Sequence, residues 1–344
     1  MSVGLVYSPT YLEHDTGQHP ENAGRLVSVM KLLEETEVVE RTVPLPLRAA
    51  TTAELARVHS ESYISHVESL AKIGGGWIDG DTVVSPASYD VALLAAGGLI
   101  NSVDAVMTGQ VESAFALVRP PGHHATRNAG AGFCLFNNIA VAAKHAIESH
   151  GLERVLVADF DVHHGNGTQD SFYYDPQVLY FSTHQYPFYP GTGRIDETGA
   201  GEGEGTTVNV PLPAWCGDEE CLRAFEEILV PLARRFQPQL ILVSAGYDGH
   251  WGDRLALMQV SVAGYGRMAQ ILTSLAHELC HGRLVFTLEG GYLYEALASS
   301  VGVTIDVLSG ISDIVDPLGK PSSMRQAPPV DAILQAVRQI HRLG

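Results

Sequence analysis

The sequence has few basic residues for its length. Lys and Arg total 21 against 39 Asp and Glu, so the formal net charge of the 344-residue chain is −18. A protein that binds nucleic acid through phosphate contacts usually carries a basic face, and this balance argues against such a partner. Charged residues make up 17% of the chain and hydrophobic residues 45%, which is typical of a globular protein and not of a disordered one.

Cysteine is also scarce, and long apolar runs are missing. The four cysteines form no CxxC pair, so we expect a reducing compartment and no disulfide scaffold. No uninterrupted apolar stretch reaches the roughly 18–20 residues of a membrane span. The first residues, MSVGLVYSP, lack the basic start and apolar run of a signal peptide. These absences predict a cytoplasmic protein without a membrane partner.

What the chain does contain is an alternation of short apolar runs with longer helical patterns. The runs are rich in Val, Leu and Ile at successive positions, as in parallel strands that are buried on both faces. They lie at 4–8, 113–118, 154–160, 178–182, 206–210, 240–246 and 283–291. The helical patterns lie at 86–108, 137–149, 218–235, 261–281, 292–309 and 329–342.

This alternation predicts an α/β fold: a single-domain, three-layer α/β/α structure with a mostly parallel central sheet. We expect one catalytic domain over 1–344. Its core spans about 1–315, followed by a C-terminal loop and helix over 316–344.

Polar side chains follow four of the predicted strands. The segments after these strands carry His123 and His124, then Asp161 and its neighbours, then Asp248, and finally Tyr292. Ligands of parallel sheets bind outside the carboxyl ends of the strands. We therefore expect these residues to meet at one edge of the sheet.

Two of these segments suggest a metal site. Asp159, Asp161 and His163 occupy alternate positions, and alternate side chains of an extended segment share a face. Asp161 and His163 can then bind one ion together with Asp248 from a neighbouring strand end. Three protein ligands without a thiolate leave a position open for water and substrate, as in catalytic metal sites.

The remaining residues suit acid–base chemistry beside that metal. The turn Pro-Pro-Gly presents His123 and His124 from a stiff backbone, and each ring needs an acceptor on its second nitrogen. Asp159 and Asn166 are the candidates. Tyr292 follows two glycines, and its phenol can reach a developing oxyanion.

With these residues identified, the sequence resembles the histone deacetylase family, the zinc-dependent deacetylases of the arginase–deacetylase fold. HPENAGRL (19–26) is similar to the family's N-terminal motif, and Asn166 is typical of the class II branch and its bacterial relatives. The matching segments are RPPGHHA (119–125), GFCLFNN (132–138), DFDVHHGNGTQ (159–169), FYPGTG (188–193), VSAGYD (243–248) and LEGGY (288–292).

The resemblance implies that the enzyme removes acetyl or other acyl groups from lysine side chains of proteins or peptides. It implies one Zn²⁺ per chain, with Asp161, His163 and Asp248 as ligands. His123 and His124 match the tandem catalytic histidines, of which the second acts as general base and acid.

The same resemblance implies roles for the groups around these histidines. Asp159 matches the partner of His123, and Asn166 takes the place of the partner of His124. Tyr292 matches the tyrosine that stabilises the transition state.

The resemblance also implies a substrate tunnel and a second ion. Phe133 and Tyr189 match its aromatic walls, and Gly132 matches the residue whose carbonyl lies beside the substrate amide. Family members often hold a monovalent cation such as K⁺ through main-chain oxygens of the DxDxH segment and a serine. Here that site would involve Asp159, Asp161, His163 and Ser182.

Substrate choice stays partly open. Family members that prefer acetylated polyamines carry an acidic residue where this chain has Leu255, so acyl-lysine is the expected substrate. Asp79 or Asp81 is either a rim carboxylate that holds the substrate backbone or a solvated loop acid. The alternatives are an acetylpolyamine amidohydrolase, a two-metal ureohydrolase and an inert acyl-lysine reader. Acyl length, oligomeric state and the choice between Zn²⁺ and Fe²⁺ do not follow from the sequence.

Overall fold

The computed structural model describes residues 1–321 and 323–344. Its centre is an eight-stranded sheet in the order β2-β1-β5-β10-β9-β6-β7-β8, with every neighbouring pair parallel. The strands are β1 (Val3–Val6), β2 (Thr42–Pro44), β5 (Ser113–Ala116), β6 (Val155–Asp159), β7 (Val178–Gln185), β8 (Thr207–Leu212), β9 (Leu240–Ala245) and β10 (Leu284–Leu288). The pair β3 (Gly76–Trp77) and β4 (Val83–Val84) is antiparallel and separate from this sheet.

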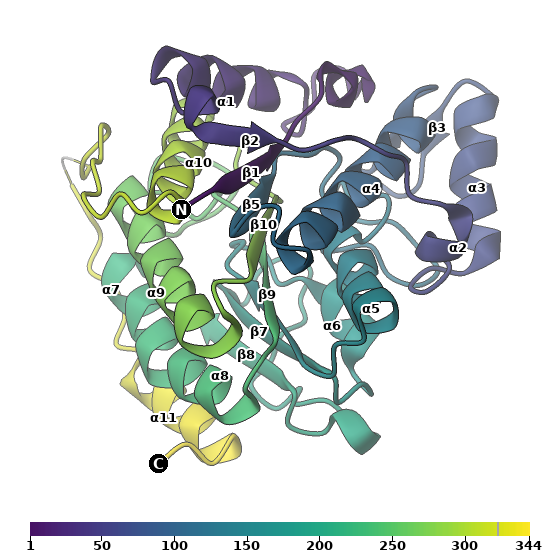
Figure 1. Cartoon of the computed structure of the whole chain (residues 1–344). Helices are drawn as coiled ribbons and strands as arrows, with labels where there is room; N and C mark the ends of the chain where they lie inside the picture. Colours follow the sequence, from purple (N-terminus) through teal and green to yellow (C-terminus); the bar gives the residue numbers. More distant parts are fainter. Residues whose placement is uncertain (322) are drawn as a thin grey trace.

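Helices cover both faces of the sheet (Figure 1). One face carries α1 (Gly24–Glu35), α7 (Asp218–Ala224), α8 (Val230–Phe236), α9 (Val262–Cys280), α10 (Tyr294–Leu308) and α11 (Asp331–Ile340). The other carries α4 (Ser88–Met107), α5 (Asn138–His150) and α6 (Asn166–Phe172), with α2 (Thr52–Leu55) and α3 (Glu61–Lys72) farther out. The expected three-layer α/β/α architecture with a parallel sheet is confirmed.

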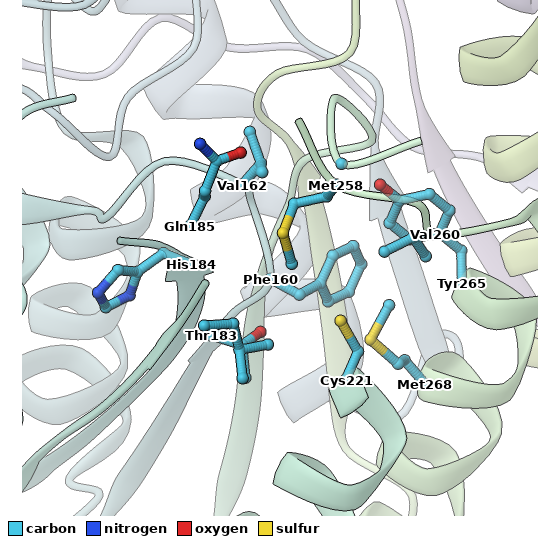
Figure 2. A pocket seen from close by; sticks show the side chains of 12 residues that line it. Phe160, Val162, Thr183, His184, Gln185, Cys221, Met258, Val260, Tyr265 and Met268 are labelled. Carbon is cyan, nitrogen blue, oxygen red and sulfur yellow. The ribbon is translucent and has the colours of Figure 1, made fainter. Parts of the chain in front are cut away.

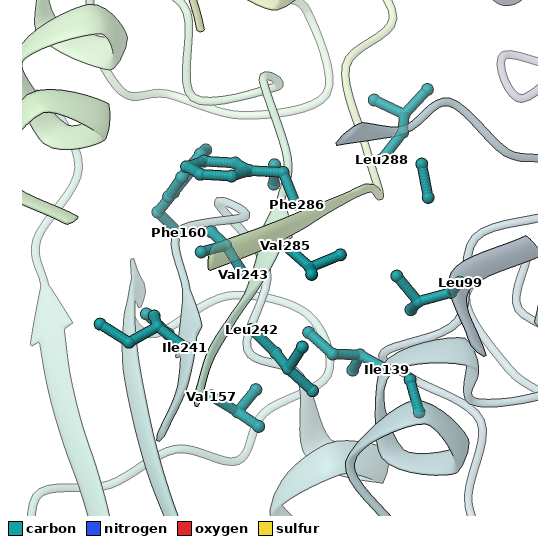
Figure 3. Packing of buried hydrophobic residues seen from close by; sticks show 14 of the residues in the cluster. Leu99, Ile139, Val157, Phe160, Ile241, Leu242, Val243, Val285, Phe286 and Leu288 are labelled. Carbon is teal, nitrogen blue, oxygen red and sulfur yellow. The ribbon is translucent and has the colours of Figure 1, made fainter. Parts of the chain in front are cut away.

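The core is apolar on both sides of the central strands. Leu242 of β9 pairs in register with Val157 of β6 and Val285 of β10, and all three side chains are fully buried. Figure 3 shows Leu242 and Val157 near Ile139 of α5, and Phe286 of β10 near Phe160. Because both faces exclude water, these strands read as continuous hydrophobic runs and not as alternating ones.

The seven expected strands are all present, but one expected helix differs. The sequence predicts a single helix over 218–235, whereas a π-helical turn at Phe225–Leu229 separates α7 from α8. Pro231 lies at the start of α8 and has no N–H to donate to the preceding turn. The interruption is accommodated by the π-helical turn, which is wider than a turn of α-helix. The short strand β2 and the helices α1, α2, α3 and α6 are not among the sequence predictions.

Helix α4 is the most apolar long helix, although polar residues interrupt its apolar stretch, as expected from the sequence. It is long and apolar enough to cross a membrane by composition alone, but 67% of its most apolar window is buried inside the protein. It packs against β1, β5 and α5. Its hydropathy is therefore explained by its place in the core.

Candidate active site

Four neighbouring strands end at the site. They are β5, β10, β9 and β6, and the segments after them carry the histidine pair, Tyr292, Asp248 and Asp161. The structure places these four segments at one edge of the sheet, where the sequence predicts them. Strand β6 ends at Asp159, so Asp161 and His163 lie in the bends that follow and not in the strand itself.

The predicted metal ligands converge. Each of Asp161, His163 and Asp248 offers one ligand atom, and these atoms lie within 4.8 Å of one another. His163 Nδ1 is 3.2 Å from Asp161 Oδ1 and 3.1 Å from Asp248 Oδ2. The site therefore uses Nδ1 of the imidazole, the nitrogen nearer the backbone.

Backbone amides fix the two carboxylates. Gly290 N donates to Asp161 Oδ2 at 2.8 Å, and Val162 N donates to Asp248 Oδ1 at 3.2 Å. A Cβ on Gly290 would collide with both carboxylates. The glycine after β10 is therefore needed so that the chain can approach them closely.

The electrostatics of this cluster favour a cation. Burial and the charge of Asp161 raise the pKa of Asp248 to about 6, because two buried carboxylates repel each other. Burial alone would lower the pKa of His163, but the two carboxylates outweigh it and raise that pKa to about 10. Two carboxylates and one imidazole form a donor set that fits a divalent transition metal.

The first histidine of the pair faces a carboxylate. His123 Nδ1 is 3.1 Å from Asp159 Oδ2, and both side chains are buried. Burial alone would lower the pKa of His123, but Asp159 and Asp161 outweigh it and raise that pKa to about 10. Asp159 also accepts from the Tyr180 hydroxyl at 3.2 Å. Asp159 thus favours the protonated form of His123.

The second histidine faces a neutral amide. His124 Nδ1 is 2.9 Å from Asn166 Oδ1, which can only accept, so Nδ1 carries the proton and Nε2 keeps a free lone pair. Burial, together with the nearby rings of His123 and His163, holds the pKa of His124 well below its usual range. The two adjacent rings, 4.0 Å apart, thus have different partners, a carboxylate for His123 and an amide for His124.

Tyr292 is held from its backbone and its ring. Its N–H donates to Asp253 Oδ2 at 2.7 Å, and the guanidinium of Arg25 lies 5.0 Å from the ring centre. The ring also meets Phe133 edge to face at 5.8 Å. Burial raises the pKa of Tyr292 well above its usual value, so the phenol stays protonated and can donate a hydrogen bond.

These groups line one cavity of about 240 Å³. Its lining residues are Asp81, Pro121, His123, His124, Gly132, Phe133, Asp161, His163, Phe188, Tyr189, Leu255, Gly290 and Tyr292.

Aromatic rings form the walls of this cavity. Phe188 stacks on His163 at 5.5 Å, and Tyr189 meets His124 edge to face at 5.1 Å. Phe133 adopts a φ of +72°, in the left-handed region that side chains rarely occupy. Such backbone strain is kept where the surrounding structure demands it.

A second, much smaller cavity of about 20 Å³ is lined mainly by buried apolar side chains (Figure 2). Phe160 and Val162 line it, and they alternate in sequence with Asp159, Asp161 and His163. It has room for about one water molecule and not for a substrate. The alternation thus sends polar side chains to the reactive side and apolar ones to the core.

The predicted residues of the cation site and of the substrate rim, Ser182, Asp79 and Asp81, have different surroundings. Ser182 pairs with Asp159 in the sheet register and hydrogen-bonds His184 Nδ1 at 2.9 Å. Asp79 accepts from the backbone N–H groups of Asp81 and Thr82 and so holds its own loop, whereas Asp81 lines the cavity. Of the two acids, Asp81 is the one at the mouth.

Several buried groups near the site were missed from the sequence. Glu289 accepts from Gly122 N at 2.7 Å and His123 N at 3.2 Å, and burial raises its pKa to about 7. The sequence feature that could have indicated Glu289 is a carboxylate directly after an apolar strand. Phe188 also lines the cavity, although the resemblance of FYPGTG (188–193) to the family implies no role for it.

A buried ion cluster was also missed. Glu21 binds Arg119 through two hydrogen bonds of 2.5 and 2.8 Å and lies 3.2 Å from Arg25. Arg25 then donates to the carbonyl of Gly291 at 2.7 Å. All three charged side chains are fully buried, so the cluster ties α1 to the strand ends that carry the site.

Known proteins are similar to this chain over most of its length. The histone deacetylase domain family matches residues 19–308. "Histone deacetylase 14, chloroplastic" of Arabidopsis thaliana is 41% identical over 98% of this chain and 85% of its own. A "Probable deacetylase" of Archaeoglobus fulgidus is 44% identical over 86% of this chain and 82% of its own.

Two further matches bear on fold and substrate. The human "Polyamine deacetylase HDAC10" is 42% identical over 95% of this chain, which spans only 50% of that protein. The crystal structure of an HDA15 HD domain superposes with a TM-score of 0.89 at 36% identity, covering 99% of this chain and 95% of that one.

Proposed function

The chain belongs to the histone deacetylase family and is a deacetylase of that family, and from this premise we propose that it is zinc-dependent and acts on acyl-lysine side chains of proteins or peptides. One observation carries the proposal. Asp161, His163 and Asp248 converge beside an aromatic-lined cavity, and Asp161, His163 and His124 line it.

The three convergent residues would hold the metal. A Zn²⁺ ion bound there would polarise the amide carbonyl and acidify a water molecule. The donor set has no thiolate, so Fe²⁺ competes by availability. The arrangement of Asp159 and Ser182 across β6 and β7 is compatible with a K⁺ site, which we keep as part of the proposal.

Acid and base roles follow from the partners of the two histidines. His124 is neutral, with its protonated Nδ1 on Asn166, so its Nε2 can take a proton from the attacking water and later give it to the leaving amine. His123 faces the carboxylate of Asp159, which favours its protonated form and makes it the poorer base of the two. In that form, its positive charge would stabilise the developing negative charge.

Tyr292 completes the reaction. Its protonated phenol can donate to the oxygen that becomes negative when the carbonyl is attacked. One donor of this kind contributes on the order of 3 kcal/mol to transition-state stability. Arg25, 5.0 Å from the ring centre, and Asp253, on the backbone N–H, hold the ring in place.

The walls of the cavity suit a lysine stem. Four methylene groups between the backbone and the amide are apolar, and Phe133, Phe188 and Tyr189 offer apolar surface. Asp81 at the mouth can accept from the substrate backbone. Leu255 presents no charge to attract a second amine of a polyamine.

The competing substrate is an acetylated polyamine, because one relative of 42% identity is named a polyamine deacetylase. The test compares kcat/KM of the zinc-loaded chain on acetyl-lysine peptides, longer acyl-lysine peptides and acetylspermidine. We expect an acyl-lysine peptide to be preferred. A preference for acetylspermidine would refute the lysine assignment. A zinc-bound chain inert on the whole panel would favour a reader.

The four cysteines agree with a reducing compartment. Cys134, Cys216, Cys221 and Cys280 are all buried and unpaired. We keep the cytoplasm as the proposed location.

A further inference from the structure

A second group of metal-binding side chains lies outside the site described so far. It consists of Asp104 in the last turn of α4 and of His145 and His150 on α5. Asp104 Oδ1 is 2.7 Å from Nε2 of each histidine. The three ligand atoms fall within 4.8 Å of one another, as tightly as those of the first group.

This group sits at the opposite edge of the sheet. Helix α5 ends at His150 and leads into the start of β6, and α4 leads in the same way into the start of β5. The deacetylase site lies at the carboxyl ends of those strands. Neither the tunnel nor the acid–base groups touch Asp104, His145 or His150, so the proposed reaction does not explain them.

We propose that Asp104, His145 and His150 form a second site for a divalent transition metal of the Zn²⁺ class. The bound ion would cross-link α4 and α5. Two imidazoles and one carboxylate are ligands that Zn²⁺ accepts, with nitrogen and oxygen at about 2.0–2.2 Å. Ligands around a tetrahedral ion at that distance stand about 3.3 Å apart. The observed 2.7 Å contacts therefore need to open by roughly half an ångström.

The surroundings allow a cation there. Side-chain exposure is 38% for Asp104 and 21% for His150, so water can reach the site and supply a fourth ligand. The neighbouring guanidinium groups are already neutralised: Arg48 pairs with Glu54 at 2.7 Å and Arg57 with Glu148 at 2.8 Å.

The ring of His145 has partners for its other nitrogen. Its Nδ1 is 3.2 Å from Ser149 Oγ, which can accept the proton that Nδ1 must carry when Nε2 binds a metal. Arg57 Nη1 lies 3.4 Å from the same Nδ1 and must turn away when that nitrogen carries the proton. Acceptors of this kind orient metal-binding imidazoles and fix their tautomer.

A metal cross-link between these helices would raise the stability of the native state and leave the deacetylation rate unchanged. Helices α4 and α5 pack together over one face of the sheet, and an ion that binds only the folded pair stabilises the native state by mass action. We expect saturating Zn²⁺ to raise the melting temperature through this site by about 2–4 °C.

The test isolates the second site by removing the first. The chain carrying Asp161→Ala is equilibrated with buffered micromolar Zn²⁺ and its metal is counted by elemental analysis. We expect about one Zn²⁺ per chain. Adding His150→Gln keeps a side chain that can hydrogen-bond Asp104 but removes the imidazole. The count should then fall to near zero, and the Zn²⁺-dependent rise in melting temperature should vanish.

A matched control and an activity measurement complete the design. His66→Gln, at an exposed histidine of α3, should keep the ion. Zinc-loaded His150→Gln with Asp161 intact should deacetylate at the wild-type rate. The proposal is overturned if the Asp161→Ala chain binds no Zn²⁺ under these conditions, or if its ion survives His150→Gln. Neither outcome depends on whether the first site binds zinc.

Discussion

Replacing Asn166 by Asp changes the charge beside the proposed base without changing its shape. Asn166 Oδ1 accepts from His124 Nδ1 at 2.9 Å, and His124 is buried. A carboxylate there would stabilise the protonated ring and raise the pKa of His124. The base would then be blocked by a proton at pH values where the wild type is active.

The size of this effect can be bounded. Two unit charges about 4 Å apart interact by about 4 kcal/mol at an effective dielectric constant near 20. One pKa unit corresponds to about 1.4 kcal/mol, so the upper bound is about 3 units. Burial of the new carboxylate offsets part of this, and we expect a rise of about 1–2 units.

The assay is the pH dependence of kcat/KM between about pH 4 and 9, whose acid limb reports the pKa of the base in the free enzyme. The range starts low because the pKa of wild-type His124 lies well below its usual value. For Asn166→Asp, the limb should move to higher pH, so activity falls most on the acid side and recovers as the pH rises. Tyr292→Phe is the control, because it should lower the rate at every pH and leave the limb in place. An acid limb that does not move in Asn166→Asp would show that His124 is not the titrating base.

Three other substitutions test separate parts of the site. Tyr292→Phe should lower kcat about 10²–10³-fold at unchanged zinc content, because one oxyanion donor is lost, and unchanged turnover would remove Tyr292 from the chemistry. Asp161→Asn should weaken zinc binding by at least about 100-fold in competition with a chelator, since it removes a charged ligand; full retention would contradict its role. Leu255→Glu should improve kcat/KM on acetylspermidine relative to an acetyl-lysine peptide by about threefold to tenfold, because it adds a charge at the rim. Leu255→Gln, which adds no charge, should leave that ratio unchanged.

Most of the site's placement was predictable because strand ends are local signals. Apolar runs located β5, β6, β9 and β10, and the rule for parallel sheets then placed the polar residues that follow them at one edge. The same reasoning missed α1, although Leu26, Val29 and Leu33 have helical spacing and are buried.

Contacts between distant segments were not predictable in the same way. Glu21 and Arg119 are 98 positions apart, and Glu289 reaches Gly122 across 167. Hydrophobic periodicity describes which face of an element is buried, but it does not say which buried charges will meet. The resemblance to a family supplied the roles of His123 and His124. The structure supplied the reason they differ, a carboxylate partner for one and an amide for the other.

The position of β10 has a consequence for how the protein is made. It is the last strand along the chain, yet it lies between β5 and β9 in the middle of the sheet. While the ribosome is still translating residues before 284, β5 and β9 lack their shared neighbour, and each presents an unpaired edge. Such long-range pairing forms slowly and leaves the nascent chain open to aggregation, which favours protection by a chaperone. Tyr292 lies four positions after the end of this strand, so the phenol of the proposed active site is added to the growing chain only after β10 has been made.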